Sequence, residues 1–237
     1  MTPEISLIHP TARTRPSEAF PLGWLEAERS WFEAAEAPER VEYILAIHES
    51  RWGDWRQLPV AFSPWGYGTR LVCSHGRDCC VDNSAAAIAL SAGKLLVIVM
   101  DDLFPPQGWD RMLVEALGGD LDQEAVVHVS TGARNDDRVF IPQVCTRKRL
   151  ERYGYVGHPA YYSMFVDNEF TDVARRDGVV IEAMHIRFHH RHPHISPGAQ
   201  SDGIYESHAN RRVFLEGKAL YEARKAAGFP KEWPPCP

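Results

Sequence analysis

The sequence lacks an excess of positive charge. Among its 237 residues, 26 lysines and arginines stand against 32 aspartates and glutamates, and the formal net charge is −6. Proteins dedicated to nucleic acids usually carry a basic face, so this balance argues against that class. One local basic cluster is present and is best explained as the solvated face of a helix: Arg147, Lys148, Arg149 and Arg152. The composition therefore argues against an extended nucleic-acid-binding face and is compatible only with a local nucleic-acid site.

The sequence also lacks an apolar run of membrane-spanning length and a secretory signal segment. Its cysteines are few, odd in number and without regular spacing: Cys73, Cys79, Cys80, Cys145 and Cys236. Together with His75, the first three match no regular zinc motif. These absences favour a protein of the reducing cytoplasm.

The first half of the chain contains a regular alternation of apolar and helical segments. With 44% hydrophobic residues, the chain can bury a proper core. Strands are predicted at residues 5–9, 41–47, 71–74, 94–100 and 125–130. Helices are predicted at residues 17–35, 83–91 and 108–117, and a loop at residues 49–68. This order predicts an α/β fold with a mostly parallel central sheet and helices on both faces.

The second half has a less regular pattern. Residues 140–143 are predicted to be short and extended, residues 161–176 helical in their later part, and residues 179–188 a strand. A histidine-rich loop is predicted at residues 189–197 and a final helix at residues 215–227. No internal repeat is present, so we expect one domain.

Polar residues follow three of the predicted strands, at residues 10–13, 48–49 and 101–102. Ligands of parallel sheets bind beyond the carboxyl ends of the strands, so these residues should share one crevice. Asp101 and Asp102 follow a buried strand and are suited to a hard divalent cation that bridges two phosphates. The alternative is that one aspartate caps a turn while the other is solvated.

Two further groups carry candidate chemistry. Five imidazoles occur within ten residues: His185, His189, His190, His192 and His194. One of them could complete the coordination begun by Asp102, since imidazole binds Mn²⁺ or Zn²⁺. Asp167 and Glu169 lie where a loop becomes a helix, and a carboxylate there could act as a general base. Acidic residues in a first helical turn explain this position equally well.

Five segments in order make the chain resemble the family 2 glycosyltransferases and their small bacterial and phage relatives. They are residues 6–11 (SLIHPT), 92–102 (AGKLLVIVMDD), 104–110 (FPPQGWD), 158–169 (HPAYYSMFVDNE) and 188–193 (FHHRHP). The resemblance implies a single GT-A domain over residues 1–237, with a nucleotide-sugar half at 1–118 and an acceptor half at 119–237. It implies a metal-dependent, inverting transfer of a sugar, with a UDP-sugar as expected donor. The implied acceptor is a hydroxyl of a glycan or of a phage-type modified DNA base.

The resemblance also implies roles for single residues. Asp167 would be the general base, and Asp102 with His190 would hold Mn²⁺ or Mg²⁺, with His189 and His192 as alternative ligands. Contacts to the donor nucleotide would come from Pro10, Thr11, Ala12, Arg13, Glu49 and Asp101. The chain departs from the family pattern at Met100, which stands where the first acid of Asp-x-Asp is usual.

Two other classes of function compete with this interpretation. A nucleotidyltransferase would favour a glycine-rich phosphate loop after the first strand, and residues 10–16 contain no glycine. A non-catalytic module that binds a metal or a nucleotide would account for the histidine cluster alone.

Overall fold

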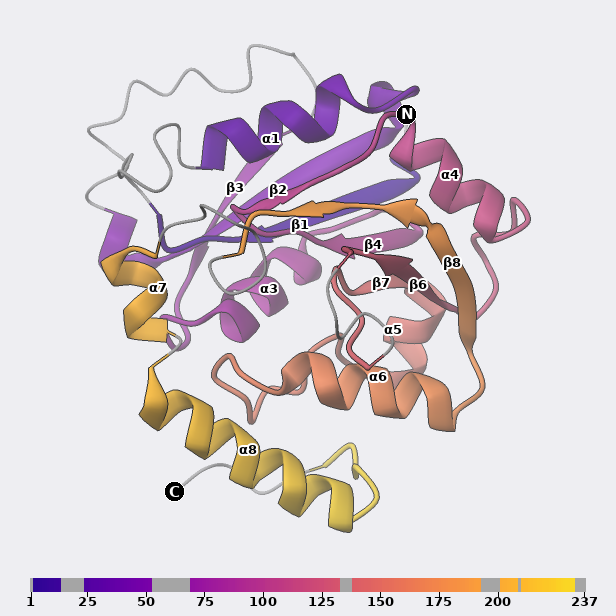
Figure 1. The fold of residues 1–237 in the computed structure, drawn as a ribbon. Coiled ribbons are helices and arrows are strands. Elements are labelled where there is room, and N and C mark those ends of the chain that lie inside the picture. The colour runs from indigo at the N-terminus through magenta and orange to yellow at the C-terminus, as the bar shows by residue number, and fades with distance from the viewer. Residues whose placement is uncertain are drawn as a thin grey trace.

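A computed structural model of the chain describes residues 2–13, 24–52, 69–132, 138–192, 201–208 and 210–232. Its centre is a seven-stranded sheet in the order β3-β2-β1-β4-β7-β6-β8 (Figure 1). The strands are β1 (Ile5–Pro10), β2 (Val41–His48), β3 (Thr69–Ser74), β4 (Leu95–Ile98), β6 (Val126–Ser130), β7 (Val144–Thr146) and β8 (Val180–Arg187). Strand β7 is antiparallel to both of its neighbours, and all other pairs are parallel. The predicted mostly parallel sheet is confirmed.

Helices cover both faces of the sheet, as the apolar strands predict. Helices α1 (Trp24–Glu33) and α4 (Trp109–Ala116) lie on one face, and α3 (Cys80–Ala89), α5 (Arg147–Tyr153) and α6 (Val166–Arg176) lie on the other (Figure 1). Successive residues of a strand point to opposite faces. Leu7 accordingly packs in the cluster that contains Trp31 and Trp109, whereas Ile8 packs on the α3 side.

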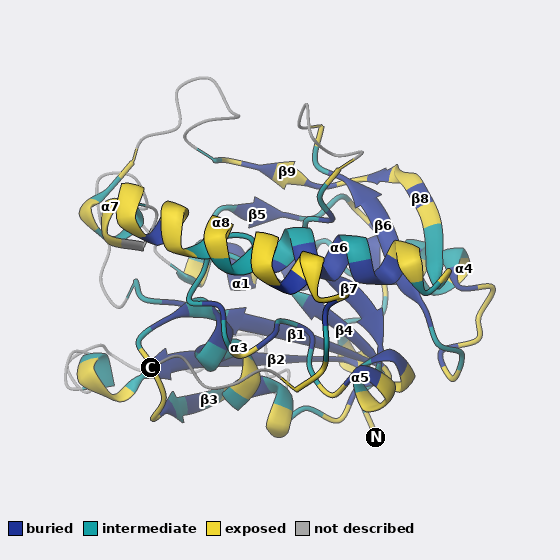
Figure 2. Ribbon diagram, turned by 90° about the horizontal axis from the view of Figure 1, so that it is seen from below, coloured by how far each residue is buried: buried dark blue, intermediate teal, exposed yellow. Residues whose placement is uncertain are grey.

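The last helix, α8 (Arg211–Ala226), packs outside α6 and leaves most of its outer surface exposed (Figure 2). It begins four residues before the predicted start because the side chain of Asn210 accepts a hydrogen bond from the backbone N–H of Val213. The remaining short helices are η1 (Pro38–Arg40), η2 (Glu49–Arg51) and α7 (Gly203–His208). Among the described segments, every helix is too short or too polar to traverse a bilayer.

Some predicted boundaries were wrong. The extended segment predicted at residues 140–143 contains a cis Ile141–Pro142 peptide, and the strand of this region, β7, follows it. Helix α3 begins at Cys80, three residues early, because Cys79 Sγ accepts the Asp82 N–H. Residues 14–23, 53–68 and 193–200, with parts of the predicted first helix and of both predicted loops, lie outside the described residues.

The histidine-rich segment was predicted to be a loop throughout, and this was wrong. His189 and His190 form strand β9, which pairs antiparallel with β5 (Leu103–Phe104). Leu103 lies opposite His190 in this pairing, and the backbone N–H of Arg191 donates to the Asp102 carbonyl at 2.7 Å. The ladder therefore places His190 beside Asp102, although the two are far apart in sequence.

Candidate active site

A cavity of about 280 Å³, named the polar cavity for the charged side chains in its lining, opens beyond the carboxyl ends of β1 and β4. Its walls come from the residues after these strands, the start of α3, the start of α6, strand β9 and helix α7. Eight of the nine predicted site residues line it: Pro10, Thr11, Ala12, Arg13, Asp101, Asp102, Asp167 and His190. The strand ends and the helix start thus meet at one place.

The structure does not bring Glu49 to this cavity. After β2 ends at His48, the chain turns into η2 and carries Glu49 to the surface, where its side chain is 54% exposed. Its carboxylate pairs with His75 Nδ1 at 2.9 Å. Within the described residues, the end of β2 therefore contributes no carboxylate to the cavity lining.

Asp101 organises the loop that follows β1. Its carboxylate accepts hydrogen bonds from His9 Nε2 at 2.9 Å, Thr11 Oγ1 at 2.9 Å and Arg13 Nη1 at 2.8 Å. Burial alone would raise the pKa of Asp101, but the His9 hydrogen bond and the Arg13 charge hold it below its usual value. The carboxylate is therefore ionised at neutral pH and fixes the positions of Thr11 and Arg13.

Arg13 also joins the cavity to helix α7. Its Nε and Nη2 atoms donate to the two carboxylate oxygens of Asp202 at 3.0 and 3.1 Å. Asp202 directly precedes α7, whose residues Ile204 and Tyr205 line the cavity. Sequence reasoning missed this wall because α7 is short and has no periodic apolar pattern. The guanidinium is thus committed to two carboxylates while it faces the cavity.

Asp102 and His190 form a pair suited to a divalent cation. Asp102 Oδ2 and His190 Nε2 are 3.4 Å apart. Two ligands about 2.1 Å from one ion are separated by about 3 Å or slightly more, so this spacing fits a shared ion. Within the described residues, no cluster of three or more such ligands occurs. The residues therefore fit a cation of the Mg²⁺ or Mn²⁺ type, which takes its other ligands from phosphates and water.

The other two histidines of the segment are placed differently. The His189 side chain is exposed, on the strand position next to His190. His192 lines the cavity, where its Nε2 atom hydrogen-bonds the Tyr205 hydroxyl at 3.2 Å. Of the three candidates, His190 is the one paired with the Asp102 carboxylate.

Asp167 lies at the N-terminal end of α6, where it is partly buried. Burial raises its pKa to about 6, although the nearby His190 acts in the opposite direction. Gln143 Nε2 donates to its Oδ1 atom at 3.4 Å. A carboxylate with this pKa is ionised at neutral pH and basic enough to accept a proton from a hydroxyl.

Glu169, two residues away, has a structural role. It is almost fully buried and forms a bidentate ion pair with Arg224 of α8, with both N–O distances at 2.7 Å. The Tyr161 hydroxyl donates a third hydrogen bond at 2.9 Å. The two acids that the sequence places in one helical turn thus separate into a cavity group and a core group.

Asn83 is a further polar group of the cavity. It is only 2% exposed and lines the cavity from the first turns of α3. Its Oδ1 atom accepts no hydrogen bond from any part of the chain that the structure describes. Buried amide oxygens are normally satisfied, which marks Asn83 as a candidate ligand contact. Asn83 was not among the predicted site residues. Its place in the cavity depends on α3 beginning at Cys80, three residues before the predicted start.

Comparisons with known proteins agree with this architecture. No protein-family model matches the sequence, and no curated protein matches it closely enough to count as a relative. Solved structures do match. The mannosyltransferase PcManGT from Pyrobaculum calidifontis, solved with GDP-Man and Mn²⁺, aligns with TM-score 0.58 and 17% identity, over 96% of this chain and 76% of its own.

Two further structures show the same likeness. Glucosyl-3-phosphoglycerate synthase from Mycobacterium tuberculosis, in complex with Mn²⁺, UDP and phosphoglyceric acid, aligns with TM-score 0.55 and 14% identity, over 96% of this chain and 80% of its own. TarS of S. aureus, in complex with UDP, aligns with TM-score 0.56 and 10% identity, over 78% of this chain. This chain spans 59% of the length of that TarS chain. The sheet order and these alignments show that the protein has the GT-A fold.

Proposed function

We propose that this protein is a glycosyltransferase that moves a sugar from a nucleoside diphosphate sugar to an acceptor hydroxyl. The observation that carries the proposal is the cavity at the ends of β1 and β4, where Asp102, His190 and Asp167 meet within a GT-A fold. The similar structures contain UDP or GDP-Man together with a divalent cation, which supports a nucleotide sugar as donor.

In this proposal the donor diphosphate lies beside Asp102 and His190. A divalent cation held there would neutralise the charge that develops on the departing diphosphate. The loop that follows β1, held in place by Asp101, would contact the nucleotide through Thr11 and the backbone of Pro10 and Ala12.

Asp167 would accept the proton of the acceptor hydroxyl. We propose direct displacement, which inverts the anomeric centre. Asp167 lines the same cavity as the Asp102–His190 pair and has a raised pKa, so it could take the acceptor proton while the diphosphate departs beside that pair. Asp101 is ill-suited to this role since three side chains already donate to its oxygens.

The first test is replacement of Asp102 by alanine. Wild-type protein should melt at a higher temperature with one nucleoside diphosphate plus Mn²⁺ than with either alone, because ligands that bind the folded form stabilise it. The Asp102→Ala variant should lose the metal-dependent part of this shift. Asp122→Ala, at an exposed position paired with Lys94, is the matched control. A shift that survives in Asp102→Ala would remove Asp102 from the metal site.

A second test concerns Asn83. Because its Oδ1 atom is buried without an intramolecular partner, Asn83→Ala should leave the melting temperature unchanged or slightly raised. If the amide binds the nucleobase or ribose, the Kd of the nucleoside diphosphate should rise about ten-fold. Calorimetric titration measures both Kd and stoichiometry. An unchanged Kd would show that Asn83 makes no contact with the nucleotide.

A further inference from the structure

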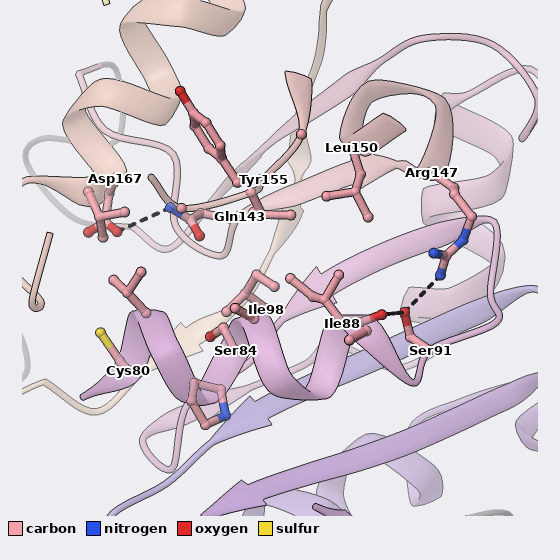
Figure 3. A pocket seen from close by; sticks show the side chains of 18 of the residues that line it. Cys80, Ser84, Ile88, Ser91, Ile98, Gln143, Arg147, Leu150, Tyr155 and Asp167 are labelled. Atoms are coloured by element: carbon pink, nitrogen blue, oxygen red, sulfur yellow. Dashed lines mark hydrogen bonds between the residues drawn. The ribbon is translucent and has the colours of Figure 1, made fainter. Parts of the chain in front are cut away.

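A second, larger cavity of about 520 Å³ lies directly beside the candidate active site. It lies between α3 on one side and α5 with the segment that precedes α6 on the other (Figure 3). The two cavities share five lining residues: Pro10, Cys80, Met100, Val166 and Asp167. Asp167 therefore faces the polar cavity and the larger one, as a base between a donor and an acceptor must.

The larger cavity is mainly apolar along its length. Ile88 of α3 and Ile98 of β4 lie side by side, and Leu150 of α5 faces them across the space (Figure 3). Helix residues from Cys80 to Ala89 line one wall, and at 1.5 Å per residue they span about 14 Å. The cavity thus has the length and the chemistry to hold an extended apolar group of a small molecule.

The positively charged side chain of Arg147 lies at the end of the larger cavity that is away from Asp167. Arg147 donates from Nε to the Gly93 carbonyl at 2.8 Å. Its Nη2 atom donates to Ser91 Oγ, also at 2.8 Å (Figure 3). Within the described residues Arg147 forms no ion pair. Arg149 and Arg152 of the same helix, in contrast, both pair with Glu124. Glu151 also lines the cavity, but its side chain is exposed. The basic cluster of the sequence therefore leaves one guanidinium available to an anion.

We propose that this cavity binds the acceptor, and that the acceptor is an amphiphile with three parts. A hydroxyl would lie at Asp167, a long apolar body along α3, and an anionic group at Arg147. The inference rests on the proposed glycosyl transfer. In that reaction the acceptor oxygen bonds to the anomeric carbon, the bond from that carbon to the diphosphate oxygen breaks, and the hydroxyl proton passes to Asp167.

The test uses ω-hydroxydodecanoate as probe, measured by calorimetric titration of the full chain without donor. The wild-type protein should bind it with one-to-one stoichiometry. Dodecanediol, which lacks the anion, should bind about ten-fold more weakly or worse, because charge-assisted hydrogen bonds are the strong ones. Dodecanoate, which lacks the hydroxyl but keeps the anion and the apolar chain, should still bind.

Two variants test the charge of Arg147 and the apolar space of the cavity separately. Arg147→Gln should weaken binding of ω-hydroxydodecanoate about ten-fold and leave that of dodecanediol unchanged. Ser84→Phe, at a half-buried position in the middle of the wall, should fill the cavity and abolish binding of both. Lys148→Gln, an exposed neighbour outside the cavity lining, is the matched control and should bind like wild type.

The outcomes separate this inference from the proposed function. If nucleoside diphosphates with Mn²⁺ stabilise the protein but ω-hydroxydodecanoate does not bind, the amphiphile is wrong and glycosyl transfer stands. If a purely polar sugar is glycosylated while Ser84→Phe retains full activity towards it, the acceptor lies elsewhere. If the probe binds as expected but no nucleotide does, the cavity is a site for an amphiphile, and both the transferase proposal and the acceptor role fail.

Discussion

Replacing Asp167 by asparagine is expected to lower the rate of sugar transfer by about 100- to 10,000-fold, the usual contribution of a general base. The amide keeps the size of the side chain but cannot accept the acceptor proton. Binding of the nucleoside diphosphate should persist, since the diphosphate lies at Asp102 and His190 in our proposal. Steady-state rates and nucleotide titrations on the same preparation separate the two effects.

The same variant should reveal the raised pKa of Asp167. The wild-type rate should fall as the pH drops through about 6, where the carboxylate becomes protonated, and the residual rate of the variant should not show this step.

The stability of the wild-type protein should change with pH in the opposite direction to its rate. The folded-state pKa of about 6 exceeds the ordinary 3.8, so the folded protein binds an extra proton between these values. The contribution of Asp167 to the free energy of unfolding is therefore most favourable below about pH 4, and this contribution is lost as the pH rises through about 6. Asparagine carries no such penalty. Asp167→Asn should thus melt a few degrees higher than wild type at pH 8 and at the same temperature at pH 4.

Asp172→Asn is the matched control, because it makes the same change on the same helix, where Asp172 pairs with Lys225 at the surface. It should leave the rate and its pH dependence unaltered. Full activity in a folded Asp167→Asn variant would disprove the assignment of the base.

The second large effect is expected for the buried ion pair of Glu169 and Arg224. Arg224 is completely buried and Glu169 nearly so, and their bidentate contact joins α6 to α8. Glu169→Gln leaves a buried guanidinium without its counter-charge, which costs about 3–5 kcal/mol of unfolding free energy. At roughly 2–4 °C per kcal/mol, the melting temperature should fall by about 10 °C.

Two variants sharpen this experiment. Glu222→Gln, on an exposed position of α8 in a loose 3.7 Å pair with Lys218, should change stability by less than about 1 kcal/mol. The double replacement of Glu169 by Gln and Arg224 by Met should recover part of the loss, because the unpaired buried charge is then gone. A stability loss in Glu169→Gln no larger than that in Glu222→Gln would show that the pair does not anchor α8.

Much of the fold was predictable because it depends on local signals. The runs 43–47 and 95–100 are apolar without alternation, as expected of strands covered on both faces, and both belong to interior strands of the sheet. The polar residues directly after β1 and β4 follow from the same boundaries, since parallel strands end at one edge of a sheet. The placement of Thr11, Asp101 and Asp102 in one cavity was therefore accessible from the sequence.

Other features depend on contacts between distant residues. Asp167 and Glu169 are both carboxylates in one helical turn, so their local sequence does not distinguish them. Glu169 belongs to the core because it pairs with Arg224, 55 residues further along the chain. Arg149 and Arg147 belong to one basic cluster, and only Glu124 and Asp177 neutralise the first.

Local sequence patterns were enough to predict the α/β architecture, the strand ends that carry polar groups, and the carboxylates and imidazoles available for a site. Periodicity and strand boundaries are properties of neighbouring residues, so one chain suffices to read them. Which of these groups share a cavity depends on how distant parts of the chain pack together. The β5–β9 ladder places His190 beside Asp102, η2 carries Glu49 away, and the space between α3 and α5 forms the apolar cavity that reaches Asp167. These arrangements depend on long-range pairing and burial, which no local pattern encodes.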